Sequence, residues 1–215
     1  MKSYNQYCPL AHALDVVGER WSLLIVRELF EHDQLRYSDL HANLAGCGTN
    51  ILASRLKELE RHGVVARRRL PPPAASTVYE LTEYGEALRP VMHELAHWGA
   101  RSLGPPSATE DLQRGWLKGA LEIAFPPNPT DAAIEFRVGD EVASFANGDV
   151  VVGGCESADA VVEGDPAAFY CFVVHHDPAG LTVQGDEDAV RRLLDTLPDP
   201  SEPRPGLLGQ PSVVA

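Results

Sequence analysis

One stretch of the chain alternates between apolar and polar residues with the period of an α-helix. Leu52, Leu56 and Leu59 fall at positions i, i+4 and i+7, which places them on one side of a helix. Thr49 is expected to cap the start of this helix, and Gly63 suits the left-handed residue that follows its end. The opposite side carries Asn50, Ser54, Lys57 and Arg61. The pattern predicts a helix that packs on a core and presents a polar outer face.

A hairpin is predicted directly after this helix. Val64 and Val65 indicate a short strand that continues into three arginines, Arg67 to Arg69. Pro71 to Pro73 prevent regular strand pairing, and Val78-Tyr79-Glu80-Leu81 alternates like a returning strand. Two strands joined by a proline-stiffened tip form a wing, and the arginines give that wing a compact positive charge.

The residues before the polar-faced helix predict three further helices. Pro9 is suited to the first turn of one helix, and Ser38 is expected to cap a short helix that runs through Leu44. The turn Gly46-Cys47-Gly48 then leads into the polar-faced helix. The expected buried positions are Leu10, Leu14 and Val17 in the first helix and Trp21, Leu24, Ile25 and Leu29 in the second. The short helix, the turn and the polar-faced helix predict a helix-turn-helix.

A long apolar helix is predicted from Thr82 onward. Its apolar side consists of Leu88, Val91, Met92, Leu95 and Trp98. Pro90 is expected to bend the axis of this helix. Because an apolar helix outside a compact domain usually needs a partner, we expect it to pack against a second copy of the chain. Gly104-Pro105-Pro106-Ser107 interrupts the pattern, so the sequence predicts a first domain of residues 1–104 and a linker of residues 105–111.

The second half has the pattern of a smaller α/β domain, residues 112–197. A helix or helix–strand element is expected in residues 112–125, with Trp116, Leu117 and Leu121 available for burial. Strands are predicted at Ala133–Val138, Val142–Phe145, Val150–Val152, Ala160–Glu163 and Leu181–Val183, with a hairpin turn at Asn147-Gly148. Helices are predicted after Asp165-Pro166 and over Ala189–Leu197. The whole chain is expected to be α+β, followed by a mobile proline-rich tail, residues 198–215.

The net charge of −13 at first opposes binding to nucleic acid, because phosphate repels an acidic protein. The charge is unevenly distributed, however. Of 18 basic and 31 acidic residues, residues 1–104 hold 12 of each, so the remaining 6 basic and 19 acidic residues account for the whole −13. The acidity belongs to the second half, and the first half stays compatible with a phosphate-rich partner.

The cysteine spacing and the apolar runs predict a cytoplasmic protein. Cys8, Cys47, Cys155 and Cys171 show no paired spacing, and no cationic, apolar leader precedes them. No apolar run approaches the roughly 18 to 20 residues that span a bilayer. We therefore expect a reduced, soluble protein with no membrane partner, and no spacing in the sequence calls for a cofactor.

Several ordered motifs across residues 7–99 resemble the HxlR-type winged-helix transcriptional regulators, relatives of the MarR group. The motifs are Cys8-Pro9, Gly18 with Trp21, Arg36-Tyr37-Ser38-Asp39-Leu40, Leu52 with Arg55-Leu56-Lys57-Glu58-Leu59-Glu60, Gly63-Val64-Val65, Tyr79-Glu80-Leu81-Thr82 with Gly85, and Trp98-Gly99. The resemblance implies a homodimeric DNA-binding repressor or activator rather than an enzyme, with the terminal helices forming the dimer on a palindromic operator. Cys47 departs from the proline-glycine turn that the family more often has.

The residue types of the first half fit the chemistry of reading DNA. Asn50 and Ser54 can bond base edges, while the arginines and Lys57 can neutralise phosphates or enter the minor groove. The expected DNA-binding residues are Arg36, Ser38, Thr49, Asn50, Ser54, Arg55, Lys57, Arg67, Arg68 and Arg69. Arg68→Ala is expected to weaken binding to all DNA sequences alike. It is also expected to lower the slope of log affinity against log salt concentration by about one. The alternative is that these polar residues of the helix and the wing only face solvent and do not contact DNA.

Residues 112–197 resemble sterol carrier protein type 2-like domains. The resemblance rests on Ala158 to Ala167 (ADAVVEGDPA) and Leu181 to Asp186 (LTVQGD). It implies a curved sheet and helices around an apolar tunnel, with Phe136, Phe145, Phe169 and Phe172 as candidate ligand-binding walls; a plain aromatic core is the alternative. An apolar small-molecule effector would then control DNA binding. One alternative is that this domain binds no ligand and only enlarges an interface. Another is that the chain is a lipid or small-molecule carrier whose helix-turn-helix is vestigial.

Two further motifs point to other chemistry. His93-Glu94-Leu95-Ala96-His97 matches the H-E-x-x-H pattern of zinc peptidases. The same helix carries the apolar stripe, and no third ligand is evident by spacing, so we expect neither a metal site nor catalysis there. Cys8 occupies the position at which some HxlR-type regulators, which this chain resembles, carry a redox-sensing thiol. Its expected place at a helix N-terminus favours a reactive thiolate, and a plain structural cysteine is the alternative.

Overall fold

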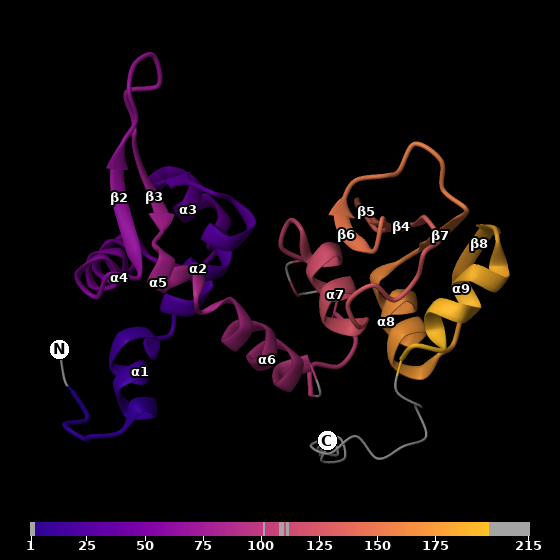
Figure 1. Ribbon diagram of the computed structural model, residues 1–215, viewed down its shortest axis with the longest axis horizontal. Coiled ribbons are helices and arrows are strands. Elements are labelled where there is room, and N and C mark those ends of the chain that lie inside the picture. The colour runs from indigo at the N-terminus through magenta and orange to yellow at the C-terminus, as the bar shows by residue number, and fades with distance from the viewer. Residues whose placement is uncertain (1–2, 101, 108–109, 111, 198–215) are drawn as a thin grey trace. The chain divides into compact units, whose positions relative to one another are not determined.

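The computed structural model describes residues 3–100, 102–107, 110 and 112–197. The chain divides into two compact units, Met1–Glu94 and Leu95–Ala215 (Figure 1). This division falls inside a helix, ten residues before the boundary expected at residue 104. Parts of the expected linker (residues 108, 109 and 111) and the whole expected tail (residues 198–215) lie outside the described residues. The α+β class expected from the sequence is confirmed.

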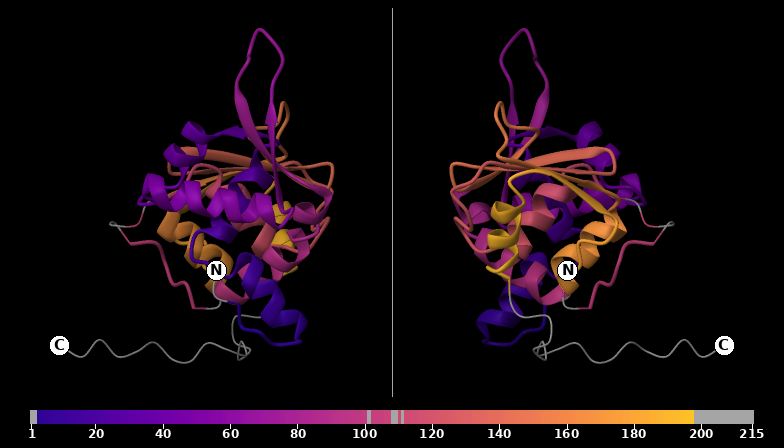
Figure 2. Two further views of the ribbon diagram at one scale, coloured as in Figure 1. Left: turned by 90° about the vertical axis from the view of Figure 1, so that its left-hand side faces the viewer. Right: turned by 90° about the vertical axis from the view of Figure 1, so that its right-hand side faces the viewer.

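The first unit combines helices with a small antiparallel sheet. Its elements are α1 (Pro9–Val17), α2 (Ser22–Glu31), β1 (Leu35–Arg36), α3 (Tyr37–Asn43), α4 (Thr49–Arg61), β2 (Val65–Arg69), β3 (Thr77–Leu81), α5 (Glu83–Glu86) and α6 (Arg89–Ala100), of which α6 continues past Glu94. The strands pair in the order β1-β3-β2. The β2–β3 hairpin extends beyond the helices of its own unit (Figures 1 and 2). The helix-turn-helix and the wing are thus both present.

The leucine stripe of α4 builds the centre of this unit, as the sequence predicted. Leu52, Leu56 and Leu59 are all at most 2% exposed and pack with α2, α3 and β2. After α4, Gly63 adopts a left-handed φ of 73°, and the Val64 amide donates to the Leu59 carbonyl at 2.9 Å. That bond, together with the one from the Gly63 amide to the Glu60 carbonyl, is the Schellman motif that ends a helix and starts a new direction.

Both predicted caps around the helix-turn-helix are wrong by one or two residues. α4 begins at Thr49 with Gly48 as its N-cap, so Thr49 lies in the first turn and caps nothing. α3 begins at Tyr37 with Arg36 as its N-cap, and the Arg36 amide donates to the Asp39 carboxylate at 3.1 Å. A carboxylate three residues into the helix can satisfy that amide, so a serine cap at Ser38 is not needed.

The predicted buried stripe of α1 is right for Val17 and wrong for Leu10 and Leu14. Leu10 is 68% exposed and Leu14 is 43% exposed, whereas Ala11, Val16 and Val17 are buried. The periodicity located an apolar face correctly, but α1 turns a different face to its own unit. Two leucines of α1 are consequently left without cover from this chain.

The long helix expected after the wing is divided in two. Thr82 caps the four-residue α5 by accepting a hydrogen bond from the Gly85 amide at 3.1 Å. A turn at Ala87 and Leu88 separates α5 from α6. Pro90 is the second residue of α6, a position where its missing amide costs no helical bond. The proline therefore marks a helix start, and the expected bend at Pro90 is not seen.

The second unit, beyond the end of α6, is a five-stranded sheet with three helices. The elements are α7 (Trp116–Ala124), β4 (Ile134–Val138), β5 (Glu141–Ala146), β6 (Asp149–Val152), β7 (Ala160–Gly164), α8 (Pro166–His175), β8 (Leu181–Gly185) and α9 (Glu187–Leu194). The strand order is β6-β5-β4-β7-β8, in which β4 and β7 are parallel and the other neighbours are antiparallel. The turn predicted at Asn147-Gly148 is confirmed, with φ of 54° and 85°.

The core of the second unit lies between the sheet and its helices. Leu117 and Leu121 of α7 and Phe172 of α8 are fully buried against Phe136 of β4, and Leu193 of α9 completes the same cluster. α9 ends at Leu194, three residues before the predicted end, because Thr196 and Leu197 close it as turns. Among the described residues, no helix combines the length and the apolar character needed to cross a bilayer.

Candidate nucleic-acid interface

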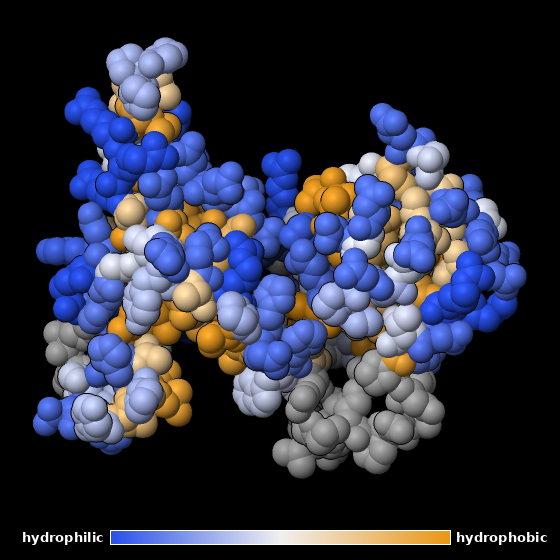
Figure 3. Space-filling view, in the orientation of Figure 1, coloured by the Kyte–Doolittle hydropathy of each residue, from blue (hydrophilic) through white to orange (hydrophobic). Residues whose placement is uncertain are grey.

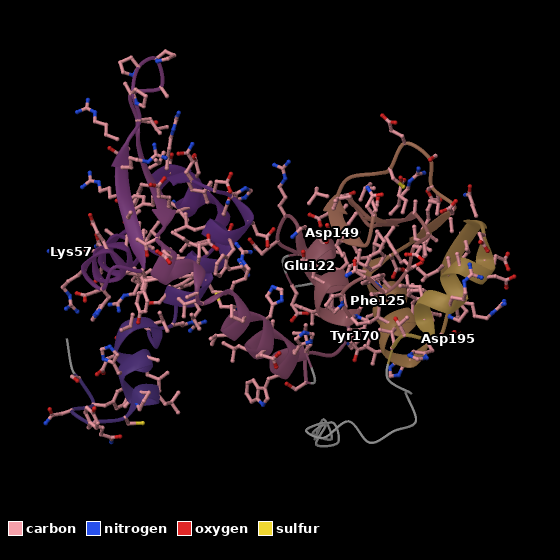
Figure 4. The ribbon with its side chains drawn as sticks, in the orientation of Figure 1. Lys57, Glu122, Phe125, Asp149, Tyr170 and Asp195 are labelled. Carbon is pink, nitrogen blue, oxygen red and sulfur yellow. The ribbon has the colours of Figure 1, made fainter. Side chains whose placement is uncertain are left out.

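The outward side of α4 is polar along its length. Asn50, Ser54 and Lys57 are exposed and follow at i, i+4 and i+7, opposite the buried leucines. Figure 4 marks Lys57 on the side of α4 that faces away from the core of the first unit. An amide, a hydroxyl and an ammonium group thus lie in one row. Such a row can donate to and accept from base edges and can neutralise phosphate.

The joint between α3 and α4 is fixed by a hydrogen bond. The Tyr37 hydroxyl donates to the main-chain carbonyl of Thr49 at 2.7 Å, and the Tyr37 ring stacks on His41 with 6.4 Å between centroids. The bond joins the first residue of α3 to the first residue of α4. Tyr37 thereby fixes how the polar-faced helix is presented relative to the preceding helix.

A buried carboxylate connects α2 with the end of α3. Glu28 is only 8% exposed, and its Oε2 accepts from Asn43 Nδ2 at 3.0 Å. Its Oε1 accepts from Arg27 Nη2 at 2.7 Å and from Arg27 Nε at 3.1 Å. Both oxygens are therefore satisfied, as a carboxylate so far from water requires. Sequence reasoning missed Glu28, because only the packing of α2 against α3 shows that its carboxylate contacts Asn43.

The three arginines of the wing do not share one environment. Arg67 pairs across the hairpin with Tyr79 and Arg69 with Thr77, whereas Arg68 pairs with Val78 and lies on the other face. Arg68 Nε donates to both carboxylate oxygens of Glu80, at 2.9 and 3.0 Å, and its Nη2 donates to Glu80 at 2.6 Å and to Gln34 at 3.0 Å. Strand alternation therefore separates Arg68 from its two neighbours.

The Arg68–Glu80 pair changes the charge that the wing presents. The hydrogen bonds with Arg68 lower the pKa of Glu80, and the same bonds raise the pKa of Arg68, so both groups stay ionised. The side chains of Arg67 and Arg69 are exposed and have no hydrogen-bond or ion-pair partner within the described part of the chain. In Figure 3 this hairpin, at the upper left, carries strongly hydrophilic residues together with hydrophobic ones below its tip. Arg67 and Arg69 are therefore the wing arginines whose positive charge no carboxylate of the described residues offsets.

The remaining candidates lie at the edges of this surface. Arg36 and Ser38 are exposed at the start of α3, and the Ser38 hydroxyl donates to Asp39 at 3.2 Å. Thr49 is exposed at the first residue of α4. Arg55 lies on the flank of α4: its side chain is 20% exposed, and Nη1 is 3.4 Å from Glu19 Oε2. The structure thus places the sequence-predicted set on α3, α4 and the wing of one unit.

Comparison with known proteins agrees with this architecture. The family profile described as HxlR-like helix-turn-helix matches residues 16–106. The uncharacterized HTH-type transcriptional regulator YvaP of Bacillus subtilis (strain 168) is 36% identical over 102 residues, which cover 47% of this chain and 94% of that protein. The HTH-type transcriptional regulator YodB of the same strain is 33% identical over 102 residues, covering 47% of this chain and 90% of YodB.

The identity and coverage decide the family. This chain belongs to the HxlR-like helix-turn-helix family. Its first half is similar in length and sequence to entire transcriptional regulators of that family. A solved structure of the reduced form of B. subtilis YodB is also similar, with 32% identity, a TM-score of 0.41, and coverage of 47% of this chain and all of that one. The family profile ends at residue 106, so it says nothing about α7 to α9 and β4 to β8.

The four phenylalanines expected to line a ligand tunnel lie together in the part beyond the HxlR-like match. Phe136, Phe145, Phe169 and Phe172 are at most 4% exposed. Their ring centroids are 5.9 to 6.5 Å apart where they meet, with two of these four contacts edge to face and two tilted. Phe125, labelled in Figure 4, meets Phe145 edge to face at 5.5 Å. Mutual ring packing accounts for their burial. Their assignment to a ligand tunnel stays a prediction.

The zinc-peptidase motif and the cysteines of this HxlR-like chain have separate settings. His93, Glu94 and His97 are exposed on α6, and no group of three or more metal-ligating side chains was found among the described residues. Cys8 is partly buried at the N-cap of α1. Cys47 is 3% exposed in the turn before α4, where burial raises the pKa of its thiol. Cys47 therefore fills the core beneath the helix-turn-helix as a neutral thiol.

Proposed function

We propose that this chain is a DNA-binding transcriptional regulator of the HxlR type that acts in the cytoplasm as a homodimer on a palindromic operator. The observation that carries the proposal is the outward row Asn50, Ser54 and Lys57 on α4, flanked by the unpaired Arg67 and Arg69 of the wing. α4 lies in the major groove with its first turn against base edges, and the wing contacts the flanking backbone.

The remaining candidate residues have distinct tasks in this proposal. Arg36 and Ser38 contact phosphates beside α3, and Thr49 does so at the start of α4, because hydroxyl and guanidinium groups serve mostly as backbone contacts. Asn50 and Ser54 bond base edges. Lys57, Arg67 and Arg69 supply positive charge for phosphates, whereas Arg55 and Arg68 supply less because Glu19 and Glu80 pair with them. Residues 1–104 have no net charge, so this half has no net repulsion of its own toward phosphate.

Selection of DNA from a random pool by the purified full chain tests the function. The expected result is an inverted repeat whose half-sites lie about one helical turn, roughly 10 base pairs, apart. A matched variant, Asn50→Ala with Lys57→Ala, changes only exposed side chains and should fold normally while losing the enrichment. Recovery of no preferred sequence by the unmodified protein would contradict the proposal.

Homodimer formation is supported by apolar side chains that this chain leaves uncovered. Leu10 and Leu14 of α1 are exposed, as are Val91, Leu95 and Trp98 of α6. Exposed apolar residues at helical spacing are typical of a subunit interface. Sedimentation equilibrium should give a dimer for the unmodified chain and a monomer for Leu95→Glu. The neighbouring exposed change Glu94→Ala should leave the dimer intact, and a monomeric parent protein would rule out this part of the proposal.

The second unit is proposed to be a sterol-carrier-like effector domain for an apolar small molecule. The support is its resemblance in sequence and a core lined by Phe136, Phe145, Phe169 and Phe172 between a sheet and helices. Delipidated protein titrated with fatty acids of increasing chain length should rise in melting temperature and change in operator affinity, since a ligand stabilises the state that it binds. Constant values with every chain length would contradict an apolar effector of this type.

Oxidation of Cys8 is proposed as a second means of control. The observation in its favour is a partly exposed thiol at the N-cap of a nine-residue helix. Treatment with peroxide should release the operator from the unmodified protein and leave Cys8→Ser bound. Cys155→Ser, which changes a partly buried thiol of the other unit, is the control and should respond like the unmodified protein. Equal sensitivity of Cys8→Ser would exclude the role.

A further inference from the structure

Ile51 is an apolar residue in the first turn of a helix whose outer side is otherwise polar. It is 46% exposed, and it is absent from the buried cluster formed by Leu52, Leu56 and Leu59 and the residues packed against them. Its apolar surface therefore contributes little to the folding of this unit. Ile51 directly follows Asn50, on the side of α4 that lies between the outward row and the core.

The surroundings of Ile51 form a pocket with a positive rim. The pocket has a volume of about 500 Å³ and is lined by Glu19, Arg20, Trp21, Gly46, Ile51 and Arg55. Arg55 faces Glu19 at 3.4 Å, so that carboxylate already has a cation beside it. Arg20 is exposed and has no hydrogen-bond or ion-pair partner in the described ranges of the chain. The pocket thus presents two apolar side chains, Trp21 and Ile51, next to one unpaired positive charge, Arg20.

We infer that this pocket is a second DNA contact, in which Ile51 packs on the 5-methyl group of a thymine and Arg20 binds a phosphate of the same half-site. The inference rests on the proposed DNA-binding function and makes it specific at the level of one base. Thymine is the only base that presents a methyl group in the major groove, and apolar side chains recognise it by contact. In this arrangement the contact of Asn50 with a base edge fixes how far α4 enters the major groove. Ile51, the next residue, therefore lies beside the base edges.

The chemistry of the pocket favours DNA over other occupants. A nucleotide offers a methyl group and an anionic phosphate close together, which matches Ile51 beside Arg20. A carboxylate ligand would find Arg20 but no partner for Ile51, and a purely apolar ligand would leave Arg20 without a counter-charge. Ile51 therefore acts as a specificity-determining residue, and Arg20 adds affinity that is independent of sequence.

Replacement of thymine by deoxyuridine tests the contact, because it removes only the methyl group and keeps the pairing edges. Operator duplexes recovered by selection are prepared with each thymine replaced in turn. For the unmodified full chain, one position in each half-site should lose about three- to fivefold in affinity, the loss expected for one buried methyl group. Ile51→Ala should bind the thymine and deoxyuridine duplexes equally at that position and retain the parent's far-ultraviolet circular dichroism.

Arg20→Ala is the complementary variant. It should lower the slope of log affinity against log salt by about 0.9 per protomer while preserving the discrimination between thymine and deoxyuridine. Ile51→Ala should preserve the slope. A selected operator that tolerates deoxyuridine everywhere, or a preference that survives in Ile51→Ala, would overturn the Ile51 contact, and an unchanged slope in Arg20→Ala would overturn the phosphate contact. Failure to select any operator would instead overturn the proposed function, and this inference with it.

Discussion

Arg68 and Glu80 form a cross-strand ion pair in the wing, with three hydrogen-bond distances of 2.6 to 3.0 Å. The two residues are diagonal neighbours on adjacent strands, since Arg68 pairs with Val78 and Ala66 with Glu80. Gln34, just before β1, accepts a further bond from Arg68. The pair therefore ties β2, β3 and the segment before β1 together, and it neutralises one of the three wing arginines.

This geometry changes the salt dependence expected for the wing. Arg67→Ala and Arg69→Ala should each lower the salt slope of operator binding by about 0.9 per protomer, since each removes an unpaired cation. Arg68→Ala should change the slope much less, in contrast to the expectation from sequence. Glu80→Gln should raise the slope, because it frees Arg68 for phosphate. A salt titration of the four variants decides the matter; equal losses for the three arginines would show that Glu80 releases Arg68 on binding.

Tyr37→Phe should loosen the joint of the helix-turn-helix without unfolding it. The change removes the 2.7 Å hydrogen bond to the Thr49 carbonyl and keeps the ring. We expect a loss of about 0.5 to 1.5 kcal/mol in the free energy of unfolding, the usual net value of such a bond. Operator affinity should fall as well, because α4 is less firmly oriented. Urea unfolding and operator titration measure the two effects, with Tyr84→Phe at an exposed ring as the control.

Glu28→Ala should destabilise the first unit more than any exposed acidic substitution. It leaves the Asn43 amide and the Arg27 guanidinium facing a site without its carboxylate. A buried group that loses its partner costs about 1 to 3 kcal/mol. Urea unfolding should show that loss for Glu28→Ala and almost none for Glu60→Ala, whose side chain is exposed on α4. Similar midpoints for the two variants would show that water replaces the lost carboxylate.

Stability of the first unit should fall on mild acidification through His62. Burial lowers the pKa of His62 below its ordinary 6.5, and the neighbouring Arg61, whose Nη2 is 2.6 Å from His62 Nε2, lowers it further. The unfolded chain therefore binds the proton more readily than the folded one, so stability is full above about pH 6.5 and is lost as the pH falls below that value. Urea midpoints between pH 7.5 and 5.5 should decline more steeply for the unmodified protein than for His62→Gln. Parallel curves would assign the decline to other groups.

Local sequence signals were reliable where the backbone needs a conformation that only a few residue types adopt easily. Gly63 ends α4 and Asn147-Gly148 turns the β5–β6 hairpin because both positions need a positive φ. The leucine stripe of α4 was recognisable because only one side of that helix is apolar. The N-caps of α3 and α4 were predicted one or two residues too late. A glycine N-cap at α4 and a carboxylate three residues into α3 take the place of the expected hydroxyl groups.

Contacts between distant residues were beyond the reach of the sequence. The separation of Arg68 from Arg67 and Arg69 depends on the register of β2 with β3, and the exposure of Leu10 depends on which face α1 turns inward. Nothing local to Glu28 indicates Asn43 as its partner.

The sequence by itself determined the helix-turn-helix, the wing, the confinement of acidity to the second half and the family, because periodicity, turn chemistry and motif order are properties of neighbouring residues. Tertiary structure alone decided which cations remain unpaired, how Tyr37 and Glu28 hold α3, and that Ile51 lies exposed beside Arg20. Those outcomes follow from packing and strand register, which join residues far apart in the chain, and a linear pattern carries no measure of that proximity.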